Sequence, residues 1–264
     1  MFKLVVTDLD NTLLEKNGEL ADSTINICRK ITEQNIILAI ATGRSFPSAK
    51  AISEKIGIDT PVICYNGAQI RNLDGSYIFS SSVPENVRKG IVYFVKERNL
   101  YLQAYDNDEI VTAKLNLKIH PDPDIKYAKY RETGDIDMLA QIDTPKFLIA
   151  TTSNKSDEIE NELREKYKNK AYFAKSESHL IEVMKHGVNK GVAVDYLAAK
   201  YKIKKNEILA IGDNTNDKLL LNHAGLKIAV GNAVESIKNI ADYVSEGERG
   251  EGFNEAITKY ILRN

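Results

Sequence analysis

The sequence predicts an α/β protein whose parallel-sheet core is interrupted by a second, inserted α/β region. In the first and last thirds of the chain, short apolar runs alternate with amphipathic segments of helical period, a pattern typical of repeated βα units. The middle third shows a different order of elements and is bounded by stretches rich in small residues, proline and glycine. A chain of 264 residues, 43% of them apolar, is long enough for a core domain and a smaller one.

The first third is expected to alternate strands and helices. In order, we expect a strand at 3–8 ("KLVVTD"), a helix near 22–34, a strand near 36–41 ("IILAIA"), a helix near 46–57 and a strand near 62–65 ("VICY"). Next, Asp74-Gly75 is a strong turn signal between two short apolar runs, "IRNL" and "SYIF". The sequence therefore predicts a hairpin at the end of this third.

The middle of the chain is expected to be a self-contained insert. From about Val83 to Met184 the pattern reads helix, strand, strand, a proline-broken loop ("HPDPDIKY"), strand ("PKFLIAT"), helix and two short strands. Its borders, "SSVP" and "KHGVNKG", have the composition of hinges. We predict a discontinuous core domain formed by residues 1–82 and 187–264 and an α/β cap domain at 83–186.

The last third returns to the alternating pattern of the first. A helix is expected near 190–201, followed by strands near 207–211 ("EILAI") and 225–230 ("GLKIAV"), with a helix beginning about Asn216 between them.

Composition excludes several classes of partner. The 36 basic and 37 acidic residues give a net charge of -1, so there is no broad positive field for nucleic acid or an anionic membrane. No segment resembles a signal peptide or approaches the ~18 apolar residues of a membrane span. The two cysteines, Cys28 and Cys64, are far apart and show no metal-binding spacing. We expect a soluble, cytoplasmic protein with no membrane partner.

Two carboxylates directly follow the first predicted strand, in "VVTDLDNTLL". Residues two apart in an extended strand project to the same side, so Asp8 and Asp10 are expected to converge beyond its carboxyl end, where open α/β sheets bind ligands. Two anions about 4 Å apart repel by roughly 4 kcal/mol at an effective dielectric of about 20. Oxygen ligands favour a hard cation such as magnesium, which would relieve that repulsion.

A calcium-binding EF-hand loop also begins Asp-x-Asp, but the positions that follow do not fit it. The sixth position of such a loop is glycine, whereas here it is Leu13 in the first stretch and Lys218 in "DNTNDK". We therefore prefer magnesium.

Three further stretches could complete a site for a phosphate group. "AIATGRS" places Thr42 and Gly43 after the second strand, where a hydroxyl and a backbone N–H can hold phosphate oxygens. "GVNKG" places Lys190 at the start of a helix, whose amide dipoles favour an anion. "AIGDNTND" ends another apolar strand with Asp213 and Asp217.

Together these four stretches resemble the haloacid dehalogenase (HAD) superfamily, and within it the Cof-type phosphatases of subfamily IIB. The family signature is DxDxT, a Ser or Thr before glycine, a lysine, and GDxxND. This chain has "DLDNT", Thr42, Lys190 and "GDNTND" in that order. The resemblance implies a Rossmann-like parallel-sheet core of the HAD-like type, with an inserted α/β cap of the C2B type. The late loop "GERGEGF" departs from the family pattern.

The resemblance also implies a chemistry. Asp8 would attack phosphorus and form an aspartyl phosphate. Asp10 would protonate the leaving oxygen and then activate the water that hydrolyses the intermediate. Magnesium would be held by the Asp8 side chain, the Asp10 backbone carbonyl and Asp213, with Asp217 either ligating it or orienting the other ligands. The phosphoryl oxygens would be held by Thr42, Lys190, Asn216 and the backbone at Leu9 and Gly43. Arg44 would join them or form a salt bridge at the rim.

The expected function is therefore magnesium-dependent hydrolysis of small phosphorylated metabolites such as sugar phosphates, by a monomer or small homo-oligomer. Two alternatives use the same residues. A phosphomutase would return the phosphoryl group to its substrate instead of releasing phosphate, and a non-catalytic protein would bind a phosphate ligand without turnover.

Overall fold

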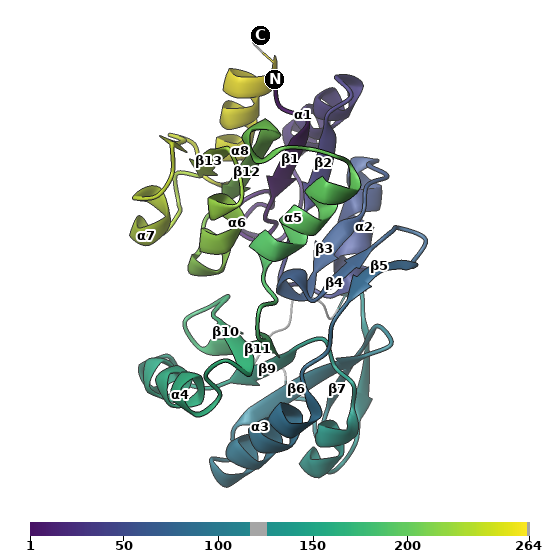
Figure 1. The fold of residues 1–264 in the computed structure, drawn as a ribbon, viewed down its shortest axis with the longest axis vertical. Helices are drawn as coiled ribbons and strands as arrows, with labels where there is room; N and C mark the ends of the chain where they lie inside the picture. The colour runs from purple at the N-terminus through teal and green to yellow at the C-terminus, as the bar shows by residue number, and fades with distance from the viewer. Residues whose placement is uncertain (117–125, 263–264) are drawn as a thin grey trace.

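The computed structural model describes residues 1–116 and 126–262, which form two bodies stacked one on the other (Figure 1). The core body holds a five-stranded sheet and a three-stranded sheet, and the cap body holds a six-stranded sheet. The N-terminus and the last helical turns of the described chain, drawn in yellow, lie at the end of the core body that is remote from the cap (Figure 1). The proline-broken loop expected at "HPDPDIKY" falls largely on residues outside the described ranges.

The core sheet is parallel throughout, as predicted. Its strands are β1 (Leu4–Thr7), β2 (Ile37–Ile40), β12 (Ile208–Gly212), β13 (Leu226–Ala229) and β14 (Tyr243–Val244), in the spatial order β14-β13-β12-β1-β2. β1 lies between β12 and β2, and all four of its side chains are buried. Strands covered on both faces read as continuous apolar runs, which explains why the sequence signal at β1 and β12 is so clear.

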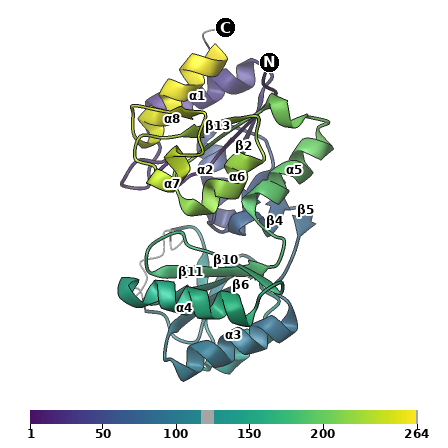
Figure 2. The same ribbon diagram turned by 60° about the vertical axis from the view of Figure 1, so that its left-hand side comes forward.

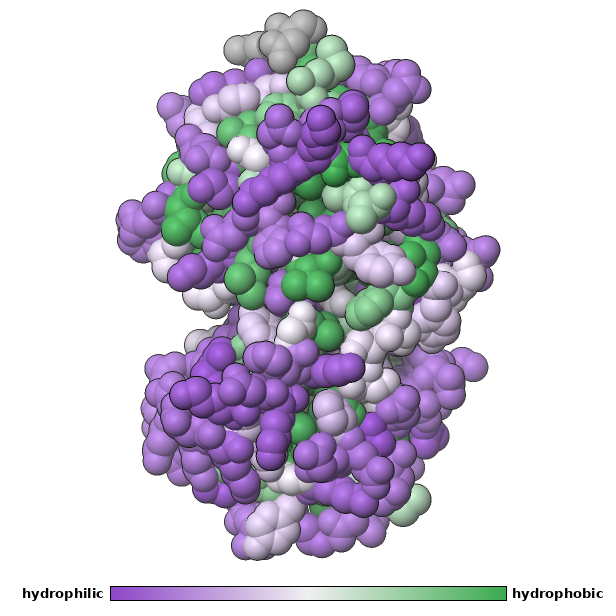
Figure 3. All heavy atoms as spheres, in the orientation of Figure 1, coloured by the Kyte–Doolittle hydropathy of each residue, from purple (hydrophilic) through white to green (hydrophobic). Residues whose placement is uncertain are grey.

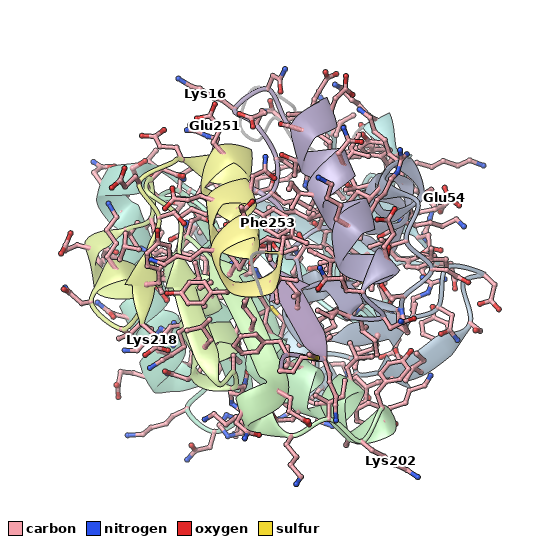
Figure 4. The ribbon with its side chains drawn as sticks, turned by 90° about the horizontal axis from the view of Figure 1, so that it is seen from above. Lys16, Glu54, Lys202, Lys218, Glu251 and Phe253 are labelled. Carbon is pink, nitrogen blue, oxygen red and sulfur yellow. The ribbon has the colours of Figure 1, made fainter. Side chains whose placement is uncertain are left out.

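Helices cover both faces of the core sheet. They are α1 (Asp22–Glu33), α2 (Phe46–Ile56), α5 (Lys190–Lys200), α6 (Lys218–Asn222), α7 (Glu235–Lys238) and α8 (Arg249–Ile257), with short turns at Lys205–Glu207, Thr215–Asp217 and Thr258–Leu262. Neighbouring residues of β1 face opposite sides, because Val5 packs in the cluster with α1, α2 and α8 whereas Val6 packs in the cluster with α5 and α6. Figure 4 shows Phe253 of α8, a fully buried member of the first cluster.

The predicted hairpin is confirmed as part of the three-stranded sheet at the border with the cap. Its strands are β3 (Val62–Cys64), β4 (Gln69–Arg71) and β5 (Tyr77–Ser80), and a helical turn at Tyr65–Gly67 joins the first two. Gly75 has a φ of 90°, the left-handed conformation that glycine adopts readily, and the Asp74 carboxylate accepts a hydrogen bond from the Ser76 N–H.

The cap body is a sheet with helices on one face. It comprises α3 (Glu85–Glu97), β6 (Tyr101–Asp106), β7 (Glu109–Thr112), β8 (Lys129–Glu132), a helical turn at Ile136–Gln141, β9 (Phe147–Ala150), α4 (Ser153–Lys166), β10 (Ala171–Ala174) and β11 (Leu180–Lys185). The strand order is β10-β11-β9-β6-β7-β8, antiparallel except for β7 and β8. Figure 2 shows α3 and α4 on the side of the cap away from the core, so the open face of the cap sheet is turned toward the core.

The predicted fold class is confirmed, since a parallel-sheet core carries a separate α/β cap. Within the described part of the cap, the elements follow the predicted order with two additions, β8 and the helical turn at Ile136–Gln141. The domain boundaries expected after residues 82 and 186 remain a prediction.

On the face shown in Figure 3, hydrophobic residues are more frequent over the core body than over the cap. Of the helices within the described ranges, none combines the length and the apolar character needed to cross a bilayer.

Candidate active site

Two carboxylates lie side by side at the carboxyl end of the core sheet. Asp8 follows β1 and Asp213 follows the neighbouring β12, and each residue is only 5% exposed. The Asp8 N–H donates to the Ile211 carbonyl at 3.1 Å, which continues the pairing of the two strands past the end of β1. The Thr12 hydroxyl donates to Asp213 at 2.8 Å. The predicted convergence of the first and last motifs is therefore present.

Asp217 lies behind this pair and is fully buried. Its carboxylate accepts hydrogen bonds from the N–H groups of Asp213 at 3.0 Å and Asn214 at 3.2 Å, so it also fixes the loop that carries Asp213. The Asp217 side chain packs so closely on the backbone of residue 212 that glycine is required there, because a Cβ would lie 2.6 Å from it. The spacing of "GDNTND" is explained by these contacts.

Lys190 connects two of the three carboxylates, Asp8 and Asp217. Its Nζ donates to Asp8 and to Asp217, each at 2.7 Å, from the first turn of α5, which Asn189 caps by accepting from the Val192 N–H. Burial lowers the pKa of the Lys190 ammonium, but the adjacent Asp217 and Asp8 carboxylates outweigh that effect and raise the pKa above its usual value. The two carboxylates therefore favour the charged ammonium form of Lys190 at the bottom of the site.

The carboxylates of the site exceed its cations. Asp8, Asp213 and Asp217 each offer an oxygen within 4.8 Å of the other two. Burial, followed by repulsion from Asp217, raises the pKa of Asp8 well above its usual value and that of Asp213 to about 7. With Asp10 included, four carboxylates face the two cations Lys190 and Arg44. An all-oxygen donor set with two surplus negative charges fits a hard divalent cation.

The Thr42–Gly43 turn lies beside this cluster, at the end of β2. Thr42 is fully buried, and its hydroxyl accepts from the Arg44 N–H at 3.1 Å. Its carbonyl accepts from the Asn66 N–H at 2.9 Å, which ties the turn to the segment after β3. The Asn216 side chain donates to Asn66 at 3.5 Å, while its own Oδ1 is buried without a hydrogen-bond partner. The predicted phosphate-binding groups Thr42, Gly43 and Asn216 thus share one neighbour, Asn66.

Arg44 forms a salt bridge at the rim, one of the two roles considered for it above. Its Nε donates to Asp10 Oδ2 at 2.8 Å and its Nη2 to Asp10 Oδ1 at 2.5 Å. Nη1 also contacts the Ser48 hydroxyl at 3.2 Å. The Arg44 side chain is buried, whereas that of Asp10 is 44% exposed. Asp10 is therefore held at the edge of the site, outside the cluster of three carboxylates.

A cavity of about 340 Å³ opens above these groups, between the core and the cap. Its core wall carries five of the predicted residues, Asp8, Asp10, Gly43, Asp213 and Asn216, together with Arg44 and the loop at 15–18. Its cap wall includes Tyr105, Lys146, Leu148, Glu177, Leu180 and Glu182. This volume is at the small end of ligand pockets, so it suits a small molecule.

The core side of the site consists largely of residues in the predicted motifs, but several residues beside them were not predicted. Leu9 was expected to act through its backbone. Its side chain is fully buried and its carbonyl accepts from Leu13 and Leu14, which shapes the loop after Asp8. The cap residues Lys146 and Glu182 were not anticipated, whereas Tyr105 lines the cavity and is also a buried member of the hydrophobic core. Asn66 lies in "CYNGAQI", a stretch that resembles the family's segment leading into the cap, and this resemblance was the one signal available for it.

Comparison with known proteins identifies the group to which this arrangement belongs. Residues 5–257 match the family model described as haloacid dehalogenase-like hydrolase. Among curated proteins, an HMP-PP phosphatase from Yersinia pseudotuberculosis is 24% identical over 243 residues, which are 90% of this chain and 87% of the relative.

Solved structures agree with the family match. A haloacid dehalogenase-like hydrolase from Bacteroides thetaiotaomicron is 28% identical with a TM-score of 0.87, over 98% of this chain and 99% of that one. A structure described as a HAD subclass IIB sugar phosphatase has a TM-score of 0.83 over 98% of both chains. Its 20% identity supports the likeness of fold alone.

Proposed function

Because the chain belongs to the haloacid dehalogenase-like hydrolases, as its motifs predicted, and is a phosphoric monoester hydrolase, we propose that it is a magnesium-dependent phosphatase of small phosphorylated metabolites that acts through an aspartyl phosphate on Asp8. The observation that carries the proposal is the position of Asp8. It is a buried carboxylate at the carboxyl end of β1, hydrogen-bonded to Lys190 and open to a cavity of small-molecule size.

The proposed reaction has two displacements at phosphorus. In the first, an Asp8 carboxylate oxygen bonds to phosphorus while the ester P–O bond breaks, and the leaving oxygen takes a proton. In the second, water bonds to phosphorus and the bond to Asp8 breaks, which releases inorganic phosphate. Lys190 neutralises the incoming phosphoryl group at the point where Asp8 must approach it, since its ammonium already contacts that carboxylate.

Asp10 is proposed to move the protons in both steps. It lies at the cavity edge, two residues from Asp8, so it can face the leaving oxygen and later the attacking water. The bidentate pair with Arg44 restricts the rotation of its carboxylate. We therefore assign Arg44 to orienting Asp10 and not to holding the phosphate.

The proposed cofactor is Mg²⁺, held by the side chains of Asp8 and Asp213, the Asp10 backbone carbonyl and Asp217, the last either directly or through its hold on the Asp213 loop. When bound, the ion would offset the surplus negative charge and draw electron density from the phosphoryl oxygens. The remaining phosphoryl contacts are assigned to the Thr42 hydroxyl, Lys190, Asn216 and the backbone at Leu9 and Gly43.

The cavity walls favour a leaving group without further negative charge. Away from the acid cluster, the ionisable groups on these walls are three glutamates and two lysines, Lys16 and Lys146, besides the paired Arg44. Lys146 is already paired with Glu182, which leaves two glutamates against Lys16, so a second anionic group would meet a net negative charge. Glutamate oxygens instead accept hydrogen bonds from hydroxyl groups. We therefore propose sugar phosphates and similar monoesters as the substrates.

A screen of phosphorylated metabolites with magnesium, read as release of inorganic phosphate, tests this function. We expect sustained release from sugar monophosphates by the unmodified enzyme and none by Asp8→Asn, with both proteins showing the same circular dichroism spectrum. Transfer of phosphate back to substrate would favour a phosphomutase, and tight binding without turnover would favour a binding protein. The expected cytoplasmic location and the expected state of a monomer or small homo-oligomer remain predictions.

A further inference from the structure

Two cap residues of opposite charge are buried against the Thr42–Gly43 turn of the core. Lys146 Nζ lies 2.6 Å from Glu182 Oε1 and donates to the Gly43 carbonyl at 2.7 Å. Neither side chain is more than 3% exposed. Lys146 directly precedes β9 and Glu182 lies in β11, the adjacent strand. In Figure 2 β11 lies on the core side of the cap, so this pair connects the two bodies.

A buried ion pair is a weak source of stability, because the cost of removing two charges from water offsets their attraction. The role of this pair is therefore to be sought in its contacts. Lys146 holds the backbone of a residue assigned above to the phosphoryl group, and Glu182 holds a side chain beside it.

Glu182 contacts Asn66, the residue shared by the phosphate-binding groups. Its Oε2 accepts a hydrogen bond from Asn66 Nδ2, while the other end of that amide accepts from Asn216. Asn66 and the preceding Tyr65 have φ values of 54° and 51°, a left-handed conformation that asparagine adopts more readily than most residues and that is unusual for a bulky residue such as tyrosine. The Tyr65 ring meets that of Tyr105 edge-on, with centroids 5.1 Å apart, so the cap contacts both of these residues.

Gly43 depends on the same contacts for its orientation. A Cβ at this position would lie 3.3 Å from Asn66 Oδ1 and 3.3 Å from Glu182 Oε1, so the amide and the carboxylate pack directly on the glycine. Glycine has wide backbone freedom, and a turn that contains it needs restraint from its surroundings to keep one conformation. Here Lys146 supplies that restraint by holding the carbonyl.

We propose that Lys146 and Glu182 are positioning residues that couple docking of the cap to phosphate binding. With the cap docked, they hold the Gly43 backbone and the Asn66 side chain in the arrangement that receives the phosphoryl group. If the cap moves away, both contacts break and the turn loses its restraint. This inference rests on the proposed function, because it takes the Gly43 turn as the phosphate site.

The test compares binding of inorganic phosphate by variants, measured by calorimetry in the presence of magnesium. A single change such as Lys146→Met would leave Glu182 buried and unpaired, which can unfold the protein. We therefore use the double variant Lys146→Met/Glu182→Gln, in which both charges are removed and the Gln oxygen can still accept from Asn66. We expect its melting temperature to stay within a few degrees of the unmodified enzyme's, while the Kd for phosphate rises at least about tenfold, as for the loss of a charge-assisted hydrogen bond.

The matched control is a second ion pair between core and cap that does not contact the turn. Arg71 of β4 donates to Asp108 of the cap at 2.5 and 3.2 Å, and Asp108→Asn removes its charge. We expect this variant to bind phosphate within twofold of the unmodified enzyme. The inference is overturned if the double variant also binds within twofold, or if Asp108→Asn weakens binding as much as the double variant does. Failure of the proposed function would appear separately, as no phosphate release by the unmodified enzyme.

Discussion

Arg44 binds the Asp10 carboxylate through two nitrogen atoms, and this pair lies at the edge of the cavity, whereas Lys190 binds two of the other three carboxylates, Asp8 and Asp217. Two aspartates only two residues apart are thereby given different surroundings. Asp8 is buried beside an ammonium and other acids, whereas Asp10 is half-exposed and paired with a guanidinium. Such a difference suits a nucleophile and a proton carrier.

The proton role of Asp10 predicts a dependence on the leaving group. Asp10→Asn cannot donate a proton, so esters of poorly acidic alcohols should lose activity by about 10²–10⁴-fold. An aryl phosphate, whose leaving oxygen needs little help from an acid, should lose less in its first step. Single-turnover assays with an alkyl and an aryl ester, which isolate that step, would measure the two losses. Equal losses for both esters would contradict the assignment.

If Arg44 orients Asp10, a change at Arg44 should also reduce activity, but by less than the change at Asp10. Arg44→Lys keeps a positive charge but cannot reproduce the two parallel hydrogen bonds, so Asp10 gains freedom of rotation. We expect kcat for an alkyl ester to fall about tenfold with KM little changed. A rise in KM with constant kcat would instead indicate that Arg44 holds the phosphate. The steady-state constants of the two proteins decide between these roles.

Removal of the metal should stop the reaction reversibly. A chelator is expected to abolish phosphate release, and excess Mg²⁺ should restore it, because the acid cluster needs a cation to bind a phosphate dianion. Mg²⁺ should also raise the melting temperature by mass action. Asp213→Asn is expected to reduce that thermal gain, whereas Asp195→Asn, a change on the surface of α5, should not. Full activity in the presence of the chelator would refute the proposed cofactor.

Glu255, which lies on α8 two residues after the late stretch "GERGEGF", is expected to make a pH-dependent contribution to stability. Burial raises the pKa of Glu255, but hydrogen bonds from the Tyr243 hydroxyl and from the N–H groups of Gly247 and Glu246 outweigh it and lower the pKa below its usual value. Since the folded-state pKa is depressed, this stabilisation is present above the ordinary value and is lost as pH falls through the folded-state value.

We therefore expect Glu255→Gln to lower the melting temperature by about 1–3 °C at neutral pH, with a smaller difference near about pH 3. Thermal denaturation of the two proteins at both pH values would measure this difference in melting temperature. Glu251→Gln is the control, because Glu251 is an exposed carboxylate of the same helix (Figure 4). A difference that grows as the pH falls would show that the carboxylate of Glu255 is not the stabilising form.

The parts of the fold and site that could be predicted are those encoded by local pattern. β1 and β12 are continuous apolar runs that end in carboxylates, so both strands and the meeting of Asp8 with Asp213 followed from strand periodicity and sheet topology. The β8 strand was missed because its residues, "KYRE", are polar and partly exposed and carry no apolar alternation.

The cap side of the site could not be predicted for a different reason. Lys146 and Glu182 are separated by 36 residues from each other and by about a hundred or more from the core groups that they contact. Neither lies in a motif, and a lysine or glutamate in an isolated sequence is usually exposed. Their burial depends on two strands of the cap sheet being placed against the Gly43 turn, which no local pattern contains.

The most direct test of the central claim is to look for the phosphate on Asp8. The enzyme would be mixed with magnesium and excess substrate, quenched in acid during turnover, digested, and its peptides analysed by mass spectrometry. We predict a phosphorylated N-terminal peptide with the modification on Asp8, absent from Asp8→Asn. Rapid phosphate release with no modified peptide at any quench time, or with the phosphate on a different residue, would contradict the account.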